Sequence, residues 1–321
     1  MEILKEFTEA FGVSGREDDI RDVITKYVMP YADEVSADAL GNLIVHKKGT
    51  GKKIMFAAHM DEIGIVVTFI DDNGFLRFSQ VGGLNRKDIL YSRVRFENGI
   101  SGVVGTEKDN KDRLISKMFI DIGVKSKEEA EKLISVGDMA MFEGAFAASG
   151  ERVISKALDN RAGCYILAQT LKKTRSENDL YFVFTVQEEV GLRGAKTAAF
   201  GVAPEYAVAV DVTDTGDTPN CEEMAVKMGG GAAVKVMDRS VICSSVVRTM
   251  LIECAKKKNI PYQLEVMTDG GTDAGAISLS AGGVMTGGVS VPTRYVHSPS
   301  EMADMSDIRA CIDLLAEFAD I

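Results

Sequence analysis

The chain has 321 residues, of which 45% are hydrophobic and 26% charged, and these proportions exclude a fibrous or mainly disordered protein. Its 37 basic and 48 acidic side chains give a formal net charge of −11, which argues against nucleic acid as a partner because phosphate backbones are repelled. No stretch approaches the roughly 20 uninterrupted apolar residues of a transmembrane helix, so no membrane partner is expected. The acidic start MEILKEFTEA lacks the order of a signal peptide, and a cytoplasmic location is expected.

The N-terminal part of the chain predicts two helices followed by two strands. Apolar residues in 2–11 recur with the 3.6-residue spacing of a helix. Ser14 is a plausible N-cap for a second helix, with Glu17 as its capping-box partner. Strand-like runs follow at 41–48 and 53–59, and the second is nearly all apolar, as in a buried central strand.

Between residues 63 and 154 the pattern changes to short alternating runs separated by turn residues such as those at 72–74. Only 126–134 has a helical pattern in this stretch. The pattern predicts a small β-rich domain, built as a barrel.

From residue 155 onward helical and strand-like patterns alternate, which is typical of a mostly parallel sheet covered by helices. We therefore predict an α/β fold with a mostly parallel mixed sheet flanked by helices. Residues 1–62 and 155–321 are expected to form one α/β domain, and 63–154 to be inserted into it.

The sequence has only three histidines, and His59 is one of two that lie close to acidic residues. It ends an apolar strand, and Asp61 and Glu62 follow it. Residues two apart in an extended segment project to the same side, so Asp61 can accept the hydrogen of one ring nitrogen while the other binds a metal. The alternative is a strand-end histidine paired with a carboxylate for solubility.

Five other polar residues stand in similar contexts, although each also has an ordinary structural explanation. Asp159 heads a predicted helix, where aspartate is a favoured N-cap. Glu188 and Glu189 end an apolar strand, and adjacent carboxylates there are unfavourable unless a cation or a shared proton relieves them. Asp211 ends another apolar strand, where an unpaired buried carboxylate would be costly. His297 lies in a polar loop, where it could simply be a surface residue.

These positions gain weight when they are combined. Ligands of open α/β sheets bind outside the carboxyl ends of the strands, and four of the residues map there: His59, Glu188, Glu189 and Asp211. Asp159 and His297 start a helix and a loop that can close the same rim. Two imidazoles and several carboxylates suit two borderline divalent cations such as Zn²⁺, Co²⁺ or Mn²⁺ with one bridging carboxylate. Such a pair would polarise a carbonyl, and a spare carboxylate could move the proton.

Six motifs, in this order along the whole chain, resemble those of the tetrahedral (TET) aminopeptidases, which are family forty-two of the metallopeptidases and carry a co-catalytic metal pair. The motifs are AHMDE (58–62), ALDNRAG (157–163), TVQEEVGLRGA (185–195), AVDVT (209–213), TDGGTDAG (268–275) and RYVHSPSE (294–301).

The resemblance implies a role for each candidate residue. One metal would be held by His59, Asp159 and Asp211, and the other by Asp159, Glu189 and His297, so that Asp159 bridges. Glu188 resembles the general base that activates the bridging water, and Asp61 resembles the residue that orients His59. The resemblance also implies a cis peptide between Asp159 and Asn160.

The resemblance further implies a metal-dependent aminopeptidase that removes N-terminal residues from short peptides. The catalytic domain would be like those of zinc peptidases, and the insert would mediate dimerisation. Dimers of this family commonly build a hollow dodecamer, and some members stay smaller. One departure is visible: a Gly-Pro-Gly-like turn is expected ahead of KVMDR, and this chain has GGGAAVKVMDR (229–239), which leaves the preferred N-terminal residue open.

Two other functions compete with a peptidase. A glycoside hydrolase would use paired carboxylates, but the absence of tryptophan and the presence of histidine among the candidate residues argue against it. A non-catalytic assembly protein would retain the shell without the chemistry. It is disfavoured because every metal and base position is filled.

Overall fold

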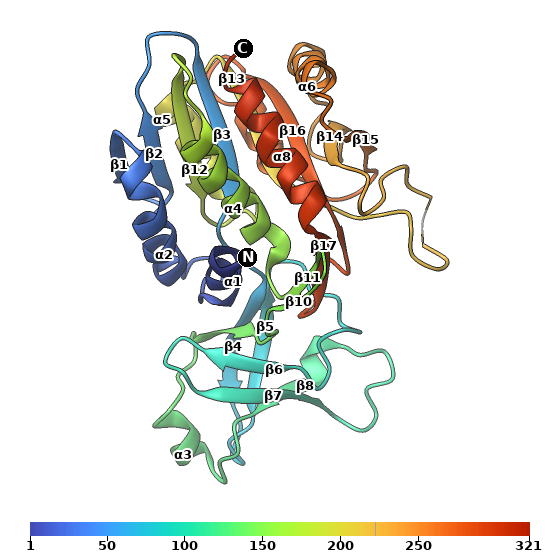
Figure 1. The fold of residues 1–321 in the computed structure, drawn as a ribbon. Helices are drawn as coiled ribbons and strands as arrows, with labels where there is room; N and C mark the ends of the chain where they lie inside the picture. The colour runs from blue at the N-terminus through green and yellow to red at the C-terminus, as the bar shows by residue number, and fades with distance from the viewer. Residues whose placement is uncertain (222) are drawn as a thin grey trace.

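In the computed structural model, which describes residues 1–221 and 223–321, eleven strands form one large mixed sheet (Figure 1). These strands are β1 (Glu34–Ala37), β2 (Leu43–Lys47), β3 (Lys53–His59), β10 (Ala147–Ser149), β11 (Arg152–Ser155), β12 (Asp179–Thr185), β13 (Tyr206–Thr213), β14 (Ala232–Met237), β15 (Tyr262–Val266), β16 (Met285–Arg294) and β17 (Glu301–Asp304). The neighbours β12, β3, β13 and β16 are parallel, and antiparallel strands flank them. The carboxyl ends of the central strands therefore meet at one edge.

A closed barrel of six antiparallel strands occupies the middle of the chain and lies below the large sheet in Figure 1. Its strands are β4 (Gly64–Ile70), β5 (Leu76–Val81), β6 (Arg93–Phe96), β7 (Ser101–Thr106), β8 (Met118–Asp121) and β9 (Met139–Phe142), and the short helices η2 (Ile115–Lys117) and α3 (Lys127–Glu131) belong to the same part. Alternate side chains of these strands point inward and form a separate apolar core. The predicted fold class, an α/β sheet with a β-rich barrel, is confirmed.

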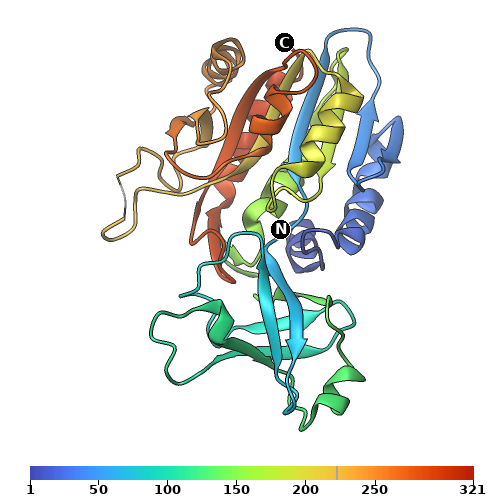
Figure 2. The same cartoon turned by 180° about the vertical axis from the view of Figure 1, so that it is seen from behind.

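Helices cover both faces of the large sheet. The helices outside the barrel are α1 (Glu2–Glu9), α2 (Asp18–Val28), η1 (Met29–Tyr31), α4 (Leu158–Lys173), α5 (Arg193–Val202), α6 (Ser245–Lys258), α7 (Asp273–Ser278) and α8 (Met305–Phe318). In Figure 1, α4 and α8 lie in front of the central strands, and Figure 2 shows α5 and α7 on the opposite face. The largest apolar core lies between the sheet and the α4–α8 layer, so the central strands are held from both sides.

The range predicted for the insert, 63–154, includes strands that do not belong to the barrel. Strand β10 and most of β11 fall within this range, and β11 pairs with β17 of the large sheet. The chain therefore returns to the large sheet a few residues before residue 154.

The second helix begins later than predicted. Helix α2 starts at Asp18, and Glu17 occupies its N-cap position. The prediction that Ser14 caps this helix is wrong, because Ser14 lies three residues before the N-cap position. Its hydroxyl donates to the Asp61 carboxylate, 2.6 Å away. This contact spans 47 residues of sequence, so no local pattern signals it.

None of the helices within residues 1–221 and 223–321 combines the length and apolar character required to cross a bilayer.

Candidate functional site

Six of the seven residues predicted to carry chemistry line one cavity of about 480 Å³ at the carboxyl edge of the central strands, and the seventh, Asp61, lies behind His59. His59 is the last residue of β3, and Asp211 lies near the end of β13. Glu188 and Glu189 follow β12, Asp159 is in the first turn of α4, and His297 lies between β16 and β17. Because the central strands are parallel, segments far apart in sequence converge here.

The imidazole of His59 is surrounded by carboxylates. Its Nε2 lies 3.2 Å from Asp159 Oδ1, 3.7 Å from Asp211 Oδ1 and 3.9 Å from Glu188 Oε2. On the other side of the ring, Nδ1 is 3.1 Å from the backbone oxygen of Asp61 and 3.4 Å from its Oδ1. The ring is thus held from its Nδ1 side, and its Nε2 faces the cavity.

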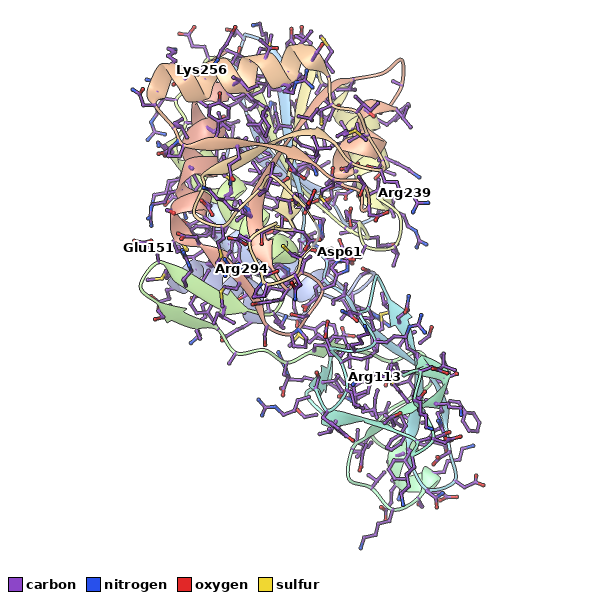
Figure 3. The ribbon with its side chains drawn as sticks, turned by 90° about the vertical axis from the view of Figure 1, so that its right-hand side faces the viewer. Asp61, Arg113, Glu151, Arg239, Lys256 and Arg294 are labelled. Carbon is purple, nitrogen blue, oxygen red and sulfur yellow. The ribbon has the colours of Figure 1, made fainter. Side chains whose placement is uncertain are left out.

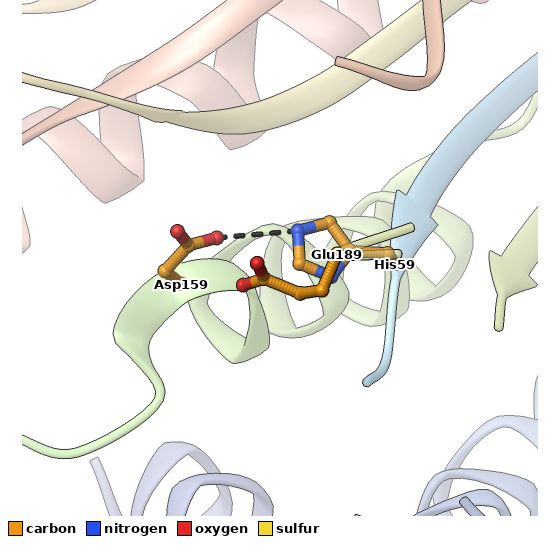
Figure 4. A group of neighbouring side chains, drawn as sticks. All are labelled: His59, Asp159 and Glu189. Atoms are coloured by element: carbon orange, nitrogen blue, oxygen red, sulfur yellow. Dashed lines mark ion pairs between the residues drawn. The ribbon is translucent and has the colours of Figure 1, made fainter. Parts of the chain in front are cut away.

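His297 approaches the same carboxylate from the opposite side. Its Nε2 is 3.2 Å from Asp159 Oδ2 and 3.3 Å from Glu189 Oε1. The two oxygens of Asp159 therefore face two different imidazoles. Donor atoms of His59, Asp159 and Glu189 lie within 4.8 Å of one another (Figure 4), and these residues span both of the predicted ligand sets.

The proton affinities of the two imidazoles are strongly raised. Burial by itself would lower the pKa of His59, but Glu188, Asp159 and Asp211 raise it well above its ordinary value. Burial opposes the same change at His297, where Glu189 and Asp159 raise the pKa to about 12. Each ring therefore sits where positive charge is strongly stabilised.

The carboxylates divide into two classes. Burial raises the pKa of Glu188 well above its ordinary value, and the negative charges of Asp211, Asp273 and Glu189 add to this effect. Burial also raises the pKa values of Glu189 and Asp211. Asp159 is the exception: burial favours its neutral form, but the adjacent His297 and His59 lower its pKa. The ionised forms of Glu188, Glu189 and Asp211 are therefore disfavoured by burial, and an adjacent cation would stabilise them.

The donor set fits divalent metal ions. Asp159 Oδ1 is buried, and within the described part of the chain it has no hydrogen-bond partner. The nitrogen and oxygen ligands available here, two imidazoles and several carboxylates, are those that Zn²⁺, Co²⁺ and Mn²⁺ accept.

The backbone around the site is held by two buried carboxylates. Asp61 Oδ1 accepts the N–H of Glu188 at 3.0 Å, and its Oδ2 accepts that of Glu189 at 3.2 Å. Figure 3 labels Asp61 where the barrel and the large sheet meet. Glu301 acts similarly, since one oxygen accepts the N–H of Asp159 and the other that of His297, both at 2.9 Å.

Glu301 and Asp273 are two further buried carboxylates of the site region that the sequence alone does not identify as functional. Glu301 ends the motif RYVHSPSE, and Asp273 lies in TDGGTDAG. Asp273 accepts a hydrogen bond from Thr185, and burial with nearby Asp211 and Asp61 raises its pKa to about 7. The contacts of Glu301 with Asp159 and of Asp273 with Thr185 each span more than 85 residues of chain, and no local pattern signals them.

The peptide between Asp159 and Asn160 is cis, as the sequence resemblance implied. The Asn160 side chain donates to the backbone oxygen of Val210 at 2.8 Å. This bond connects the first turn of α4 to the strand that carries Asp211.

The barrel contributes one wall of the cavity. A Cβ atom built on Gly83 would lie 3.0 Å from Nδ1 of His297, and one built on Gly82 would lie 3.1 Å from Oε2 of Glu189. A side chain at either position would therefore press on residues of the site, and glycine permits the close approach.

A second cavity of about 300 Å³ adjoins the first and shares Asp214, Met267 and Asp269 with it. Glu223 also lines it. Its basic lining residue Arg294 is already bound by Asp217 through two contacts, of 3.0 and 2.7 Å. The described lining therefore has a net negative character.

Comparison with known proteins gives a consistent result. A family model described as M42 glutamyl aminopeptidase matches residues 41–314. A protein of Acetivibrio thermocellus with a provisional aminopeptidase name is 56% identical over 98% of this chain and 97% of its own length.

Solved structures agree with the sequence matches. An aminopeptidase from the archaeon Desulfurococcus kamchatkensis has a TM-score of 0.96 and 40% identity, covering 99% of this chain and 94% of that one. The TET1 peptidase of Pyrococcus horikoshii, described as assembling into a tetrahedron or a large octahedral shell, has a TM-score of 0.89 and 36% identity, covering 99% and 98%.

Proposed function

Since the chain belongs to the M42 glutamyl aminopeptidase family and is a peptide hydrolase, we propose that it removes N-terminal residues from short peptides in the cavity that contains His59, Asp159 and His297. The observation that carries this proposal is that the two carboxylate oxygens of Asp159 each lie 3.2 Å from a different imidazole. A carboxylate in that position can bridge two cations.

Membership of this family implies divalent metal ions. We propose two ions per chain, Zn²⁺ or Co²⁺ in preference to Mn²⁺. His59, Asp159 and Asp211 would hold one, and Asp159, Glu189 and His297 the other. Such a pair, when bound, polarises the carbonyl of the peptide bond and strengthens water as a nucleophile near neutral pH.

Glu188 is proposed as the general base. Its Oε2 lies 3.9 Å from His59 Nε2, and its side chain retains 11% exposure to the cavity. A carboxylate whose pKa is raised by burial can take a proton from water and return it to the leaving amine. Asp61 would keep Glu188 in place through its backbone N–H.

The family match supports peptide hydrolysis over the competing glycoside hydrolase. Two imidazoles among the carboxylates also differ from the pair of carboxylates that a glycosidase needs.

The proposed function is tested with aminoacyl anilides on protein of measured metal content. Chelation should abolish cleavage, and Zn²⁺ or Co²⁺ should restore it. Glu188→Gln should keep its metal while kcat falls by ~10²–10⁴-fold, as for loss of a general base. The exposed Glu151, in an ion pair with Arg309, provides the matched control Glu151→Gln, which should be unaffected. Full activity on metal-free protein would overturn the proposal.

We propose in addition that the barrel, within the insert predicted over 63–154, mediates dimerisation, and that dimers assemble into a dodecamer. The support is the likeness to the TET1 peptidase, which forms closed shells. Light scattering coupled to size exclusion at micromolar concentration tests this assembly. A 34.7-kDa monomer under these conditions would contradict it.

A further inference from the structure

The N-terminal turn, residues 12–17, lies outside the matched range 41–314 but packs beside the functional site. The backbone N–H of Glu62 donates to Gly12 at 2.9 Å, and the N–H of Ser14 donates back to Glu62 at 3.3 Å. These bonds extend the chain after β3 by a short parallel bridge. The N-terminus lies near the junction of barrel and sheet in Figure 1. Glu17 of the turn accepts the N–H of Gln187, the residue before Glu188.

Ser14 contacts the carboxylate that holds the two adjacent glutamates. Its hydroxyl donates to Asp61 Oδ2 at 2.6 Å, and both side chains are buried. That same oxygen accepts the N–H of Glu189, and the other accepts the N–H of Glu188. The Asp61 carboxylate therefore accepts three hydrogen bonds in addition to its contact with His59. The bond from Ser14 fixes the orientation in which Asp61 accepts the N–H groups of Glu188 and Glu189.

Glu17 binds the backbone of Gln187, the residue immediately before Glu188. Its Oε1 accepts the N–H of Gly15 at 2.7 Å and that of Gln187 at 3.1 Å. Gln187 has φ of 55°, a left-handed conformation that is uncommon for a residue with a side chain. A buried acceptor at this point compensates for that backbone conformation, because the N–H of Gln187 would otherwise lose its partner.

We propose that Ser14 and Glu17 are positioning residues for the aminopeptidase reaction, an inference that rests on the proposed function. Together with Asp61 they bind three consecutive backbone N–H groups, those of residues 187–189. They thereby set where the side chains of Glu188 and Glu189 project into the cavity. The N-terminal turn is thus part of the active-site construction.

The turn also contacts the barrel. Val13 is fully buried in a small apolar cluster with Val81 and Met141 of the barrel and with Val190, which follows Glu189. The hydrogen bonds act on residues 187–189, and the apolar contacts act on the next residue. Both sets of contacts restrict the same segment from one side.

The experiment compares four variants as full-length, metal-loaded protein. Ser14→Ala removes the donor to Asp61, and Glu17→Ala removes the acceptor for Gln187. Glu17→Gln keeps an acceptor oxygen and serves as the rescue variant. Ser280→Ala is the matched control, because Ser280 is buried near α7 and its hydroxyl has no hydrogen-bond partner among residues 1–221 and 223–321.

For each variant, kcat and KM for an aminoacyl anilide, the affinity for Co²⁺, its visible absorption spectrum and the melting temperature are measured. Ser14→Ala and Glu17→Ala should lose ~10–100-fold in kcat or in Co²⁺ affinity, the range found when groups that orient metal ligands are removed. Their Co²⁺ spectra should shift. Glu17→Gln should retain most of what Glu17→Ala loses, and Ser280→Ala should match the unmodified protein.

Unchanged kcat, Co²⁺ affinity and Co²⁺ spectrum in folded Ser14→Ala and Glu17→Ala would overturn the inference, even if their melting temperatures fall. A Glu17→Gln variant as impaired as Glu17→Ala would do the same for the acceptor role of Glu17. If Glu17→Ala does not fold, Ser14→Ala decides. The Co²⁺ measurements test the positioning role separately from the proposed function. If the unmodified protein cleaves no anilide, its Co²⁺ affinity and spectrum can still be compared with those of the variants.

Discussion

One oxygen of Glu301 accepts the backbone N–H of Asp159 at 2.9 Å. Its other oxygen binds the N–H of His297, so a single buried side chain connects two segments that approach the candidate metal pair from opposite sides. The arrangement requires two acceptor oxygens.

Glu301→Gln should therefore weaken metal binding. The amide nitrogen would place a donor against a backbone N–H, leaving one buried donor without an acceptor at a cost of ~1–3 kcal/mol. We expect metal affinity to fall ~10–100-fold, measured by competition with a chromophoric chelator. The exposed Glu151→Gln serves as control. Affinity within a factor of about two of the unmodified protein would contradict a role in which both oxygens are needed.

The second cavity predicts a preference for a basic N-terminal residue. Asp269 and Glu223 line it, and Asp217 already binds Arg294. We expect lysyl and arginyl anilides to be cleaved with higher kcat/KM than the glutamyl anilide. Asp269→Asn should reduce this preference by up to about tenfold, which corresponds to ~1.4 kcal/mol. A glutamyl preference in the unmodified protein would show that this cavity does not receive the N-terminal side chain.

Glu17 should make stability depend on pH. Burial, with the nearby Asp61 charge, raises its pKa from 4.5 to about 7, against the hydrogen bonds from Gly15, Gln187 and its own amide. The folded state then binds more protons than the unfolded state between these values, so the free energy of unfolding contributed by Glu17 falls as pH rises through this window.

The comparison is between unmodified protein and Glu17→Gln in urea denaturation at several pH values from 4.5 to 8. The variant should gain stability relative to the unmodified protein by on the order of 1–3 kcal/mol across the window. A difference that is constant with pH would show that Glu17 does not titrate there.

The buried charges beside the site predict a ranking of two variants. Lys156 Nζ lies 2.7 Å from Glu62 Oε2, and Arg161 lies 3.2 Å from Glu62 Oε1. Glu62→Gln leaves two buried cations without their carboxylate and should cost ~3–5 kcal/mol in the free energy of unfolding. Lys156→Met leaves Glu62 paired with Arg161 and should cost less. Chemical denaturation measures both, and the reverse order would refute this account of the network.

Much of the architecture could be predicted because its signals are local. The run 53–59 predicts a buried strand because a short, nearly continuous apolar segment is typical of one. Strand β3 spans Lys53–His59, as predicted. The alternating runs after residue 63 predicted strands, and they form the barrel. Strand β1, by contrast, is short and mostly exposed, so its side chains carry no apolar pattern.

The candidate site also contains residues with a local sequence signal and residues without one. His59, Glu188 and Asp211 stand at strand ends, and the parallel order of the strands is enough to bring such residues together. Ser14 was misjudged because a local cap and a hydrogen bond to a residue 47 positions away look alike in sequence. Glu301 offers no signal of its own, since one of its partners is the backbone amide of Asp159, 142 residues away in sequence.

The close approach of Gly83 to His297 has a consequence for engineering. Because the barrel supplies a boundary of the cavity, removing it or exchanging it for the barrel of another protein would open the reaction chamber to solvent at the imidazole. A truncated sheet domain could retain every candidate ligand and still leave His297 unshielded. Any redesign of the barrel is therefore also an alteration of the environment of His297.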